Sequence, residues 1–196
     1  MTYERFAGVC ALAAAVAGFL YSLAFVVLRS AGLSGLWLLL VGLLSTAALL
    51  GLYERVRSVE SGFALLGLVL VVVGGLGAAI HGGFDLANAL HPPASVNVDL
   101  PSEIDPRGLL TFGVTGLGLW ALAWLIVRGG GLPRQLGYLG YLAAALAIVL
   151  YLGRLIVLDA TSPLILGPAL VAGFLVNPAW YLWLGIVLWR GSAVDS

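Results

Sequence analysis

Four polar side chains lie on one otherwise apolar stretch, residues 74 to 93 (GGLGAAIHGGFDLANALHPP). His81, Asp85, Asn88 and His91 follow one another at spacings of four, three and three residues. An α-helix turns by about 100° per residue, so these positions fall within roughly a third of its circumference. The four side chains can therefore face one shared space, and we take them as a candidate polar or ligand site.

A metal site on this face would use His81, Asp85 and His91, because imidazole and carboxylate ligands suit zinc or iron with an open coordination position. These two histidines are the whole histidine content of the chain. The multi-histidine patterns of membrane hydrolases and desaturases are therefore missing, as are HExxH, a phosphate loop and GxSxG. The sequence names no cofactor, and we rank a metal-dependent membrane enzyme third among the functions.

Arg154 and Asp159 extend the candidate site from a second helix. Counted at about 1.5 Å per residue from opposite loops, Asp85 and Arg154 reach a similar depth. Ionisable groups at membrane depth usually face a partner or a wet cavity, so we predict an ion pair between Asp85 and Arg154. The alternative is that these side chains meet water at helix ends and have no function.

Composition identifies the class of protein that carries this site. Hydrophobic residues make up 62% of the chain, charged residues only 9%, and the mean hydropathy is +1.11, whereas about a quarter of the residues of a soluble domain are charged. This is the composition of an integral membrane protein. The nine basic and nine acidic residues cancel and form no basic run, so nucleic acid is not an expected partner. The single cysteine, Cys10, leaves no intrachain disulfide to infer.

Six apolar runs are long enough for the ~20 residues that a spanning helix needs. We predict one all-α transmembrane domain over residues 1–196, a bundle of six helices. Ser34 and Ser61 are the expected N-caps of the second and third helices, and Asp105 followed by Pro106 that of the fourth. Pro168 and Pro178 should kink the last helix. The predicted spans are 6–28, 35–53, 62–90, 107–127, 134–158 and 163–189.

Small residues mark the third span as one that is packed on most sides. They fall four apart in two adjacent rows, which allows other helices to approach closely. The tryptophans near the C-terminus, among them Trp180, are expected in an aromatic belt at the membrane interface. The two rows are Gly74, Ala78 and Gly82, and Gly75, Ala79 and Gly83.

The arginines predict the orientation. With the N-terminus in the cytoplasm, six arginines would lie on that side and Arg29 and Arg107 outside, so we expect both termini to be cytoplasmic. All nine basic residues are arginine, which together with abundant Ala, Gly, Leu and Val indicates a GC-rich prokaryotic genome and thus an inner or plasma membrane. The cytoplasmic arginines are Arg5, Arg55, Arg57, Arg128, Arg134 and Arg190.

An internal repeat is a further hypothesis. Residues 24–33 (AFVVLRSAGL) align with residues 123–132 (AWLIVRGGGL) at an offset of 99. Three spans would then recur with inverted topology, as in many transporters, whose sites lie where the halves meet. The match is mostly apolar, and chance also explains it.

Three short segments carry a resemblance to known proteins: residues 5–8 (RFAG), 79–85 (AIHGGFD) and 177–185 (NPAWYLWLG). Through them the chain resembles small bacterial multi-span membrane proteins that form families of unknown function. The resemblance implies a membrane protein of six or seven helices, and it carries no substrate or catalytic residue.

Three classes of function follow. We expect first an accessory or structural subunit, or a binder of a lipid or small apolar ligand, whose partners are bilayer lipids, another membrane protein or a second copy of the chain. A small-molecule transporter or channel with an outward-facing polar site is the alternative. The lack of a nucleophile beside a base argues against hydrolysis, so we do not expect enzymatic activity.

Overall fold

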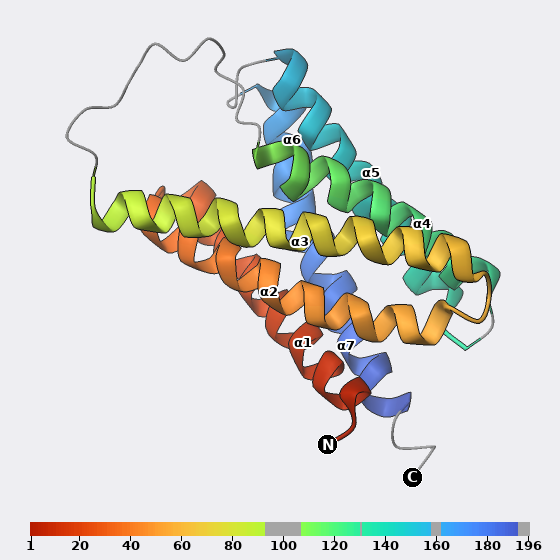
Figure 1. The fold of residues 1–196 in the computed structure, drawn as a ribbon. Coiled ribbons are helices and arrows are strands. Elements are labelled where there is room, and N and C mark those ends of the chain that lie inside the picture. The colour runs from red at the N-terminus through yellow and green to blue at the C-terminus, as the bar shows by residue number, and fades with distance from the viewer. Residues whose placement is uncertain (93–106, 130, 158–161, 192–196) are drawn as a thin grey trace.

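The structure is a computed structural model that describes residues 1–92, 107–129, 131–157 and 162–191. Throughout these residues the regular elements are helices (Figure 1). Six of the helices are long and apolar enough to cross a membrane, which confirms the prediction of an all-α membrane bundle with six spans. The spans run over Tyr3–Val27, Ala31–Val56, Ser61–Leu90, Leu109–Arg128, Arg134–Val157 and Pro163–Gly191.

Three of the spans contain a π-helical turn, in which each backbone amide reaches one residue further back than in an α-helix. The first such turn, η1, closes the first span, η2 opens the fourth, and η3 divides the last span into α6 and α7. The elements in chain order are α1 (Tyr3–Ser22), η1 (Leu23–Val27), α2 (Ala31–Val56), α3 (Ser61–Leu90), η2 (Leu109–Val114), α4 (Thr115–Arg128), α5 (Arg134–Val157), α6 (Pro163–Val171), η3 (Ala172–Val176) and α7 (Asn177–Gly191).

The last span is interrupted between its two prolines, Pro168 and Pro178. Pro178 lacks an amide hydrogen, and its ring is incompatible with a regular turn before it. The wider π turn η3 ends at Val176, just before Asn177 and Pro178. The sequence predicted a disturbance at these prolines, although not its π-helical form.

The N-caps predicted at Ser34 and Ser61 lie too far along the chain. The hydroxyl of Ser30 accepts from the amide of Leu33 at 3.4 Å, so α2 begins at Ala31, and the Ser34 hydroxyl instead donates to the carbonyl of Ala31. The cap of α3 is Glu60 rather than Ser61, because its carboxylate accepts from the first amides of the helix. The predicted cap at Asp105 lies outside the described residues.

The helices α2 and α3 form the closest pair in the fold, with glycines on both sides of the contact. A Cβ added at Gly35 would lie 2.7 Å from both the carbonyl oxygen of Gly82 and the amide nitrogen of Leu86. Gly42 and Gly75 make a second such contact two turns further along, where a Cβ on Gly75 would lie 3.0 Å from the Gly42 carbonyl oxygen. The predicted close packing along the small-residue rows of the third span is therefore present on its α2 side.

The opposite side of α3 packs closely against the fourth span. A Cβ on Gly74 would lie 3.0 Å from the carbonyl oxygen of Leu110, and the side chain of Leu110 also lies against Gly77. Nearer the start of α3, Val71 lies against Gly118 of α4. Helix α3 is thus held between α2 and the fourth span, as Figure 1 shows.

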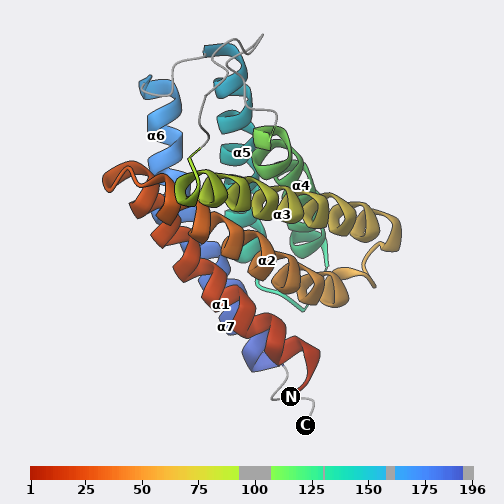
Figure 2. The same cartoon turned by 60° about the vertical axis from the view of Figure 1, so that its left-hand side comes forward.

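The start of α1 and the end of α7 lie next to each other at one end of the bundle (Figures 1 and 2). At this end Glu4 of α1 forms an ion pair with Arg55 of α2. The core nearby includes Trp180, which is 1% exposed and donates from its indole nitrogen to the carbonyl of Leu136 at 3.1 Å. The expectation that Trp180 belongs to an interfacial belt is therefore wrong: its polar atom is satisfied by a neighbouring helix, which allows the ring to be buried.

We predict that Gly82→Ala lowers the free energy of unfolding in detergent by about 1 to 3 kcal/mol, because the new methyl group overlaps the α2 backbone. Gly18→Ala is the matched control, since its Cβ would meet only Val41, at 3.9 Å. That variant should gain about 0.5 to 1 kcal/mol from the better helix propensity of alanine. Equal effects in denaturant titrations would show that α2 and α3 do not touch at Gly82.

Candidate functional site

A cavity of ≈ 470 Å³ lies inside the bundle, and every one of the six spans contributes to its wall. Its charged end is formed by His81, Asp85, Arg107 and Arg154, and its apolar end includes Leu49, Val71 and Leu119. Val71 and Asp85, which mark these ends on α3, are separated by fourteen positions in the sequence, which corresponds to roughly 20 Å of helix. The cavity is therefore long and amphipathic.

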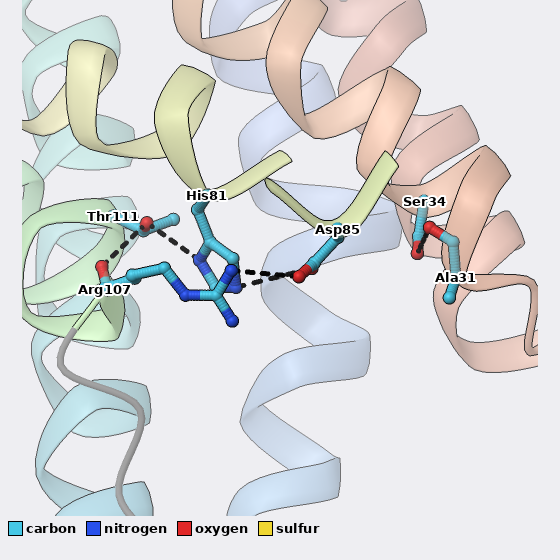
Figure 3. A network of polar contacts seen from close by, with 6 residues as sticks. All are labelled: Ala31, Ser34, His81, Asp85, Arg107 and Thr111. Atoms are coloured by element: carbon cyan, nitrogen blue, oxygen red, sulfur yellow. Dashed lines mark hydrogen bonds and ion pairs between the residues drawn. The ribbon is translucent and has the colours of Figure 1, made fainter. Parts of the chain in front are cut away.

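A ring of polar contacts joins α3 to the fourth span at the charged end (Figure 3). A nitrogen of Arg107, Nη1, donates to Asp85 Oδ1 at 3.0 Å, and His81 Nε2 lies 3.5 Å from Asp85 Oδ2. The other ring nitrogen of His81 lies 3.3 Å from the Thr111 hydroxyl, which donates to the carbonyl of Arg107 at 3.0 Å. The ring closes because each pair of residues is four apart on its helix and therefore faces the same way.

The aromatic ring of Phe84 gives Arg107 a second contact with α3. The guanidinium carbon lies 4.4 Å from the ring centroid, the geometry of a cation–π interaction. In the ring of contacts the side chains of His81, Asp85 and Arg107 are 14%, 33% and 30% exposed. These charges are thus partly shielded from solvent and satisfied by one another, as ionisable groups at membrane depth usually are.

The predicted ion pair between Asp85 and Arg154 is wrong. Among the described residues Asp85 pairs with Arg107 and His81. The depth count placed Asp85 and Arg154 correctly at the same end of the cavity, but depth alone does not say which arginine lies on the neighbouring helix face. Arg107 lies two residues before η2, which packs directly on α3, and from the sequence it was considered only as evidence for orientation.

Arg154 of α5 lines the same end of the cavity without a hydrogen-bond or ion-pair partner among the residues that the structure describes. Tyr21 of α1 also lines the cavity. The charged end therefore brings together side chains of α1, α3, α5 and the residues just before η2.

Asn88 and His91 were also predicted as site residues, but neither lines the cavity. His91 is the exposed C-cap of α3, Asn88 is half-buried and is not part of the cavity wall, and Asp159 lies outside the described residues. Within the described ranges no three His, Cys, Asp or Glu side chains come together as metal ligands would. A metal centre on His81, Asp85 and His91 thus gains no support from the geometry.

All three π-helical turns described in the structure border the cavity, and none of them was predicted from the sequence. Phe25 of η1, Thr111 of η2 and Ala172 of η3 each form part of its wall. Next to η2, the hydroxyl of Thr115 donates to the carbonyl of Leu110, five residues back, at 3.2 Å. Because π turns often occur at functional sites, their gathering here marks this cavity as the candidate site.

No protein-family model, curated protein or solved structure matches this chain. The resemblance to small bacterial multi-span proteins therefore stays an expectation from short motifs. The function is argued from the cavity and its charged end.

We predict that Asp85→Asn and Arg107→Gln couple in a double-mutant cycle, with a coupling free energy of about 0.5 to 1 kcal/mol for a pair that is about a third exposed. Thermal unfolding in detergent would measure it. The matched cycle of Asp85→Asn with Arg154→Gln should be additive within about 0.5 kcal/mol. Coupling in the second cycle and additivity in the first would reverse the assignment of the partner.

Proposed function

We propose that this protein binds a lipid or another small apolar ligand in the cavity between its spans. The observation that carries the proposal is the shape and chemistry of the cavity, which is apolar over most of its length and polar at one end. Its volume of ≈ 470 Å³ lies in the range of about 300 to 1,000 Å³ that is usual for small-molecule sites. A purely structural subunit has no need of such a space.

The surroundings of the cavity support a route for the ligand from the bilayer. Phe25 of η1 and Leu166 of α6 both line the cavity, and they are 54% and 39% exposed. Helix α6 packs against α5 and η3 and contributes only Ile165 to the buried residues. Its apolar outer surface would face lipid tails, so a ligand could reach the cavity between η1 and α6 without passing through water.

Transport is the second candidate, and the three π turns around the cavity favour it. Helices that are interrupted at the level of a substrate site are common in transporters, where the irregular backbone lines a cavity. The inverted repeat adds nothing to this candidate, because the π turns do not recur at an offset of 99: the residues corresponding to η1 are 122 to 126, within regular α4.

For the membrane and the orientation, we propose the prokaryotic inner or plasma membrane with both termini in the cytoplasm. Support comes from the six predicted cytoplasmic arginines, which all belong to helix ends or turns on the side of the termini. The charged end of the cavity would then open toward the outer face of the membrane.

Ligand binding can be tested with a neutral, photoreactive fatty alcohol in nanodiscs of phosphatidylcholine. We predict crosslinks to the apolar end of the cavity, and we predict that Ala169→Phe reduces them several-fold because the ring occupies part of the cavity. Leu170→Phe is the matched control, since Leu170 is 38% exposed and does not line the cavity. Equal labelling of both variants and the wild type would mean that the probe reaches the protein only through its outer surface.

The orientation can be tested with single cysteines in a Cys10→Ala background. Ser58 lies in the turn between α2 and α3 at the end of the termini, and Pro92 follows α3 at the other end; both are exposed. We predict that an impermeant thiol reagent added to intact cells labels Pro92→Cys but not Ser58→Cys, and that lysis exposes both. The reverse pattern would place the termini outside.

A further inference from the structure

We propose that the ligand is an amphiphile with an anionic headgroup, a phosphate or a carboxylate, which Arg154 binds at the charged end of the cavity while the apolar chain lies inside. The inference rests on the proposed function and adds the chemical class of the ligand. It follows from the balance of charges at that end and from the shape of the space behind it.

The first step is the charge balance. Asp85 is engaged by Arg107 at 3.0 Å and by His81 at 3.5 Å. Arg154 keeps a full positive charge at the same end, and no carboxylate of the described residues forms an ion pair with it. Among the described residues that line this end, two arginines outnumber the one aspartate, so their net charge is positive whether or not His81 is protonated, which favours an anion.

The second step is the chemistry of the donors. A guanidinium group presents paired N–H donors that match the oxygen atoms of a phosphate or a carboxylate, and it remains charged at any physiological pH. Tyr21 of α1 and Tyr151, one turn before Arg154 on α5, both line the cavity. A phenol group is a hydrogen-bond donor, so these side chains would add to the binding of an anion.

The third step is the space behind Arg154. From the charged end the cavity continues along roughly 20 Å of helix to Leu49, Val71 and Leu119. A free phosphate ion would leave this apolar part unoccupied. An alkyl chain would fill it with apolar contacts. An amphiphile therefore uses both ends of the cavity, whereas an inorganic anion uses one.

The test compares an alkyl phosphate, the alkanoic acid and the alcohol of the same chain length, each carrying the same photoreactive group, in nanodiscs of phosphatidylcholine. The wild-type protein should bind the two anionic probes at least about tenfold more tightly than the alcohol, as expected for hydrogen bonds to a charged group. Arg154→Gln should remove this preference and leave labelling by the alcohol unchanged. Arg154→Lys, which keeps the charge, should retain part of it.

Arg134→Gln is the matched control, because Arg134 lies at the other end of the same helix. The preference of this variant for the anionic probes should equal that of the wild type. Equal binding of the acid and the alcohol by the wild type would overturn the inference while leaving the proposed function intact, as would a preference that survives Arg154→Gln. Labelling by none of the three probes would instead refute ligand binding itself. If inorganic phosphate at millimolar concentration competes fully with the alkyl phosphate, the site binds anions without needing an alkyl chain, and the inference of an amphiphilic ligand is overturned.

Discussion

The contact between α2 and α3 at Gly35, Gly42, Gly75 and Gly82 is the constraint on which the rest of the structure depends. In a bilayer, lipid tails are as apolar as leucine, so helices are held together by close packing of small residues rather than by the hydrophobic effect. At these glycines the two backbones touch, which fixes the rotation of α3 about its axis. Once Gly82 faces α2, His81 and Asp85 must face the cavity and the fourth span.

The ring of polar contacts is the consequence of that rotation. A carboxylate placed at Asp85 without a partner would be costly at membrane depth. The fourth span supplies the partner because its first turn, with Arg107 and Thr111, lies against the same face of α3. Glycine packing on one side of α3 and charge pairing on the other therefore support each other, because a rotation of α3 that breaks one contact would also break the other.

The sequence was sufficient for the architecture and insufficient for the geometry of the site. Hydropathy alone defines the six spans, because a bilayer requires an unbroken apolar stretch whatever its neighbours are. The spacing from His81 to Asp85 correctly placed both side chains on one face, since helical periodicity is a local property. The partner of Asp85 was not predictable in this way. Arg107 and Arg154 reach the same end of the cavity, and which of them meets Asp85 depends on the helix that packs beside α3.

The π turns were unpredictable for a related reason. Only η3 has a local signal, Pro178, whose missing amide hydrogen disrupts the turn before it. Neither η1 nor η2 contains a proline, so we attribute their extra residue per turn to the packing of whole helices. The N-caps were predicted at Ser34 and Ser61, whereas the structure has them at Ser30 and Glu60. Helix ends shift by a residue or more when an earlier side chain reaches the first amides.

The three π turns and the charged end together suggest why this bundle keeps a cavity that its small residues could otherwise close. Each π turn widens its helix and frees carbonyl groups, which are tolerated at membrane depth only where protein atoms or a polar cavity satisfy them. Their placement around one space, on spans one, four and six, concentrates these exceptions where Arg107, Asp85 and His81 already require a polar environment. A well-packed bundle of the same composition would be more stable without any of them. Their accumulation around one cavity is what the proposed ligand site would require, since proteins retain local strain and unpaired charge chiefly where a ligand uses them.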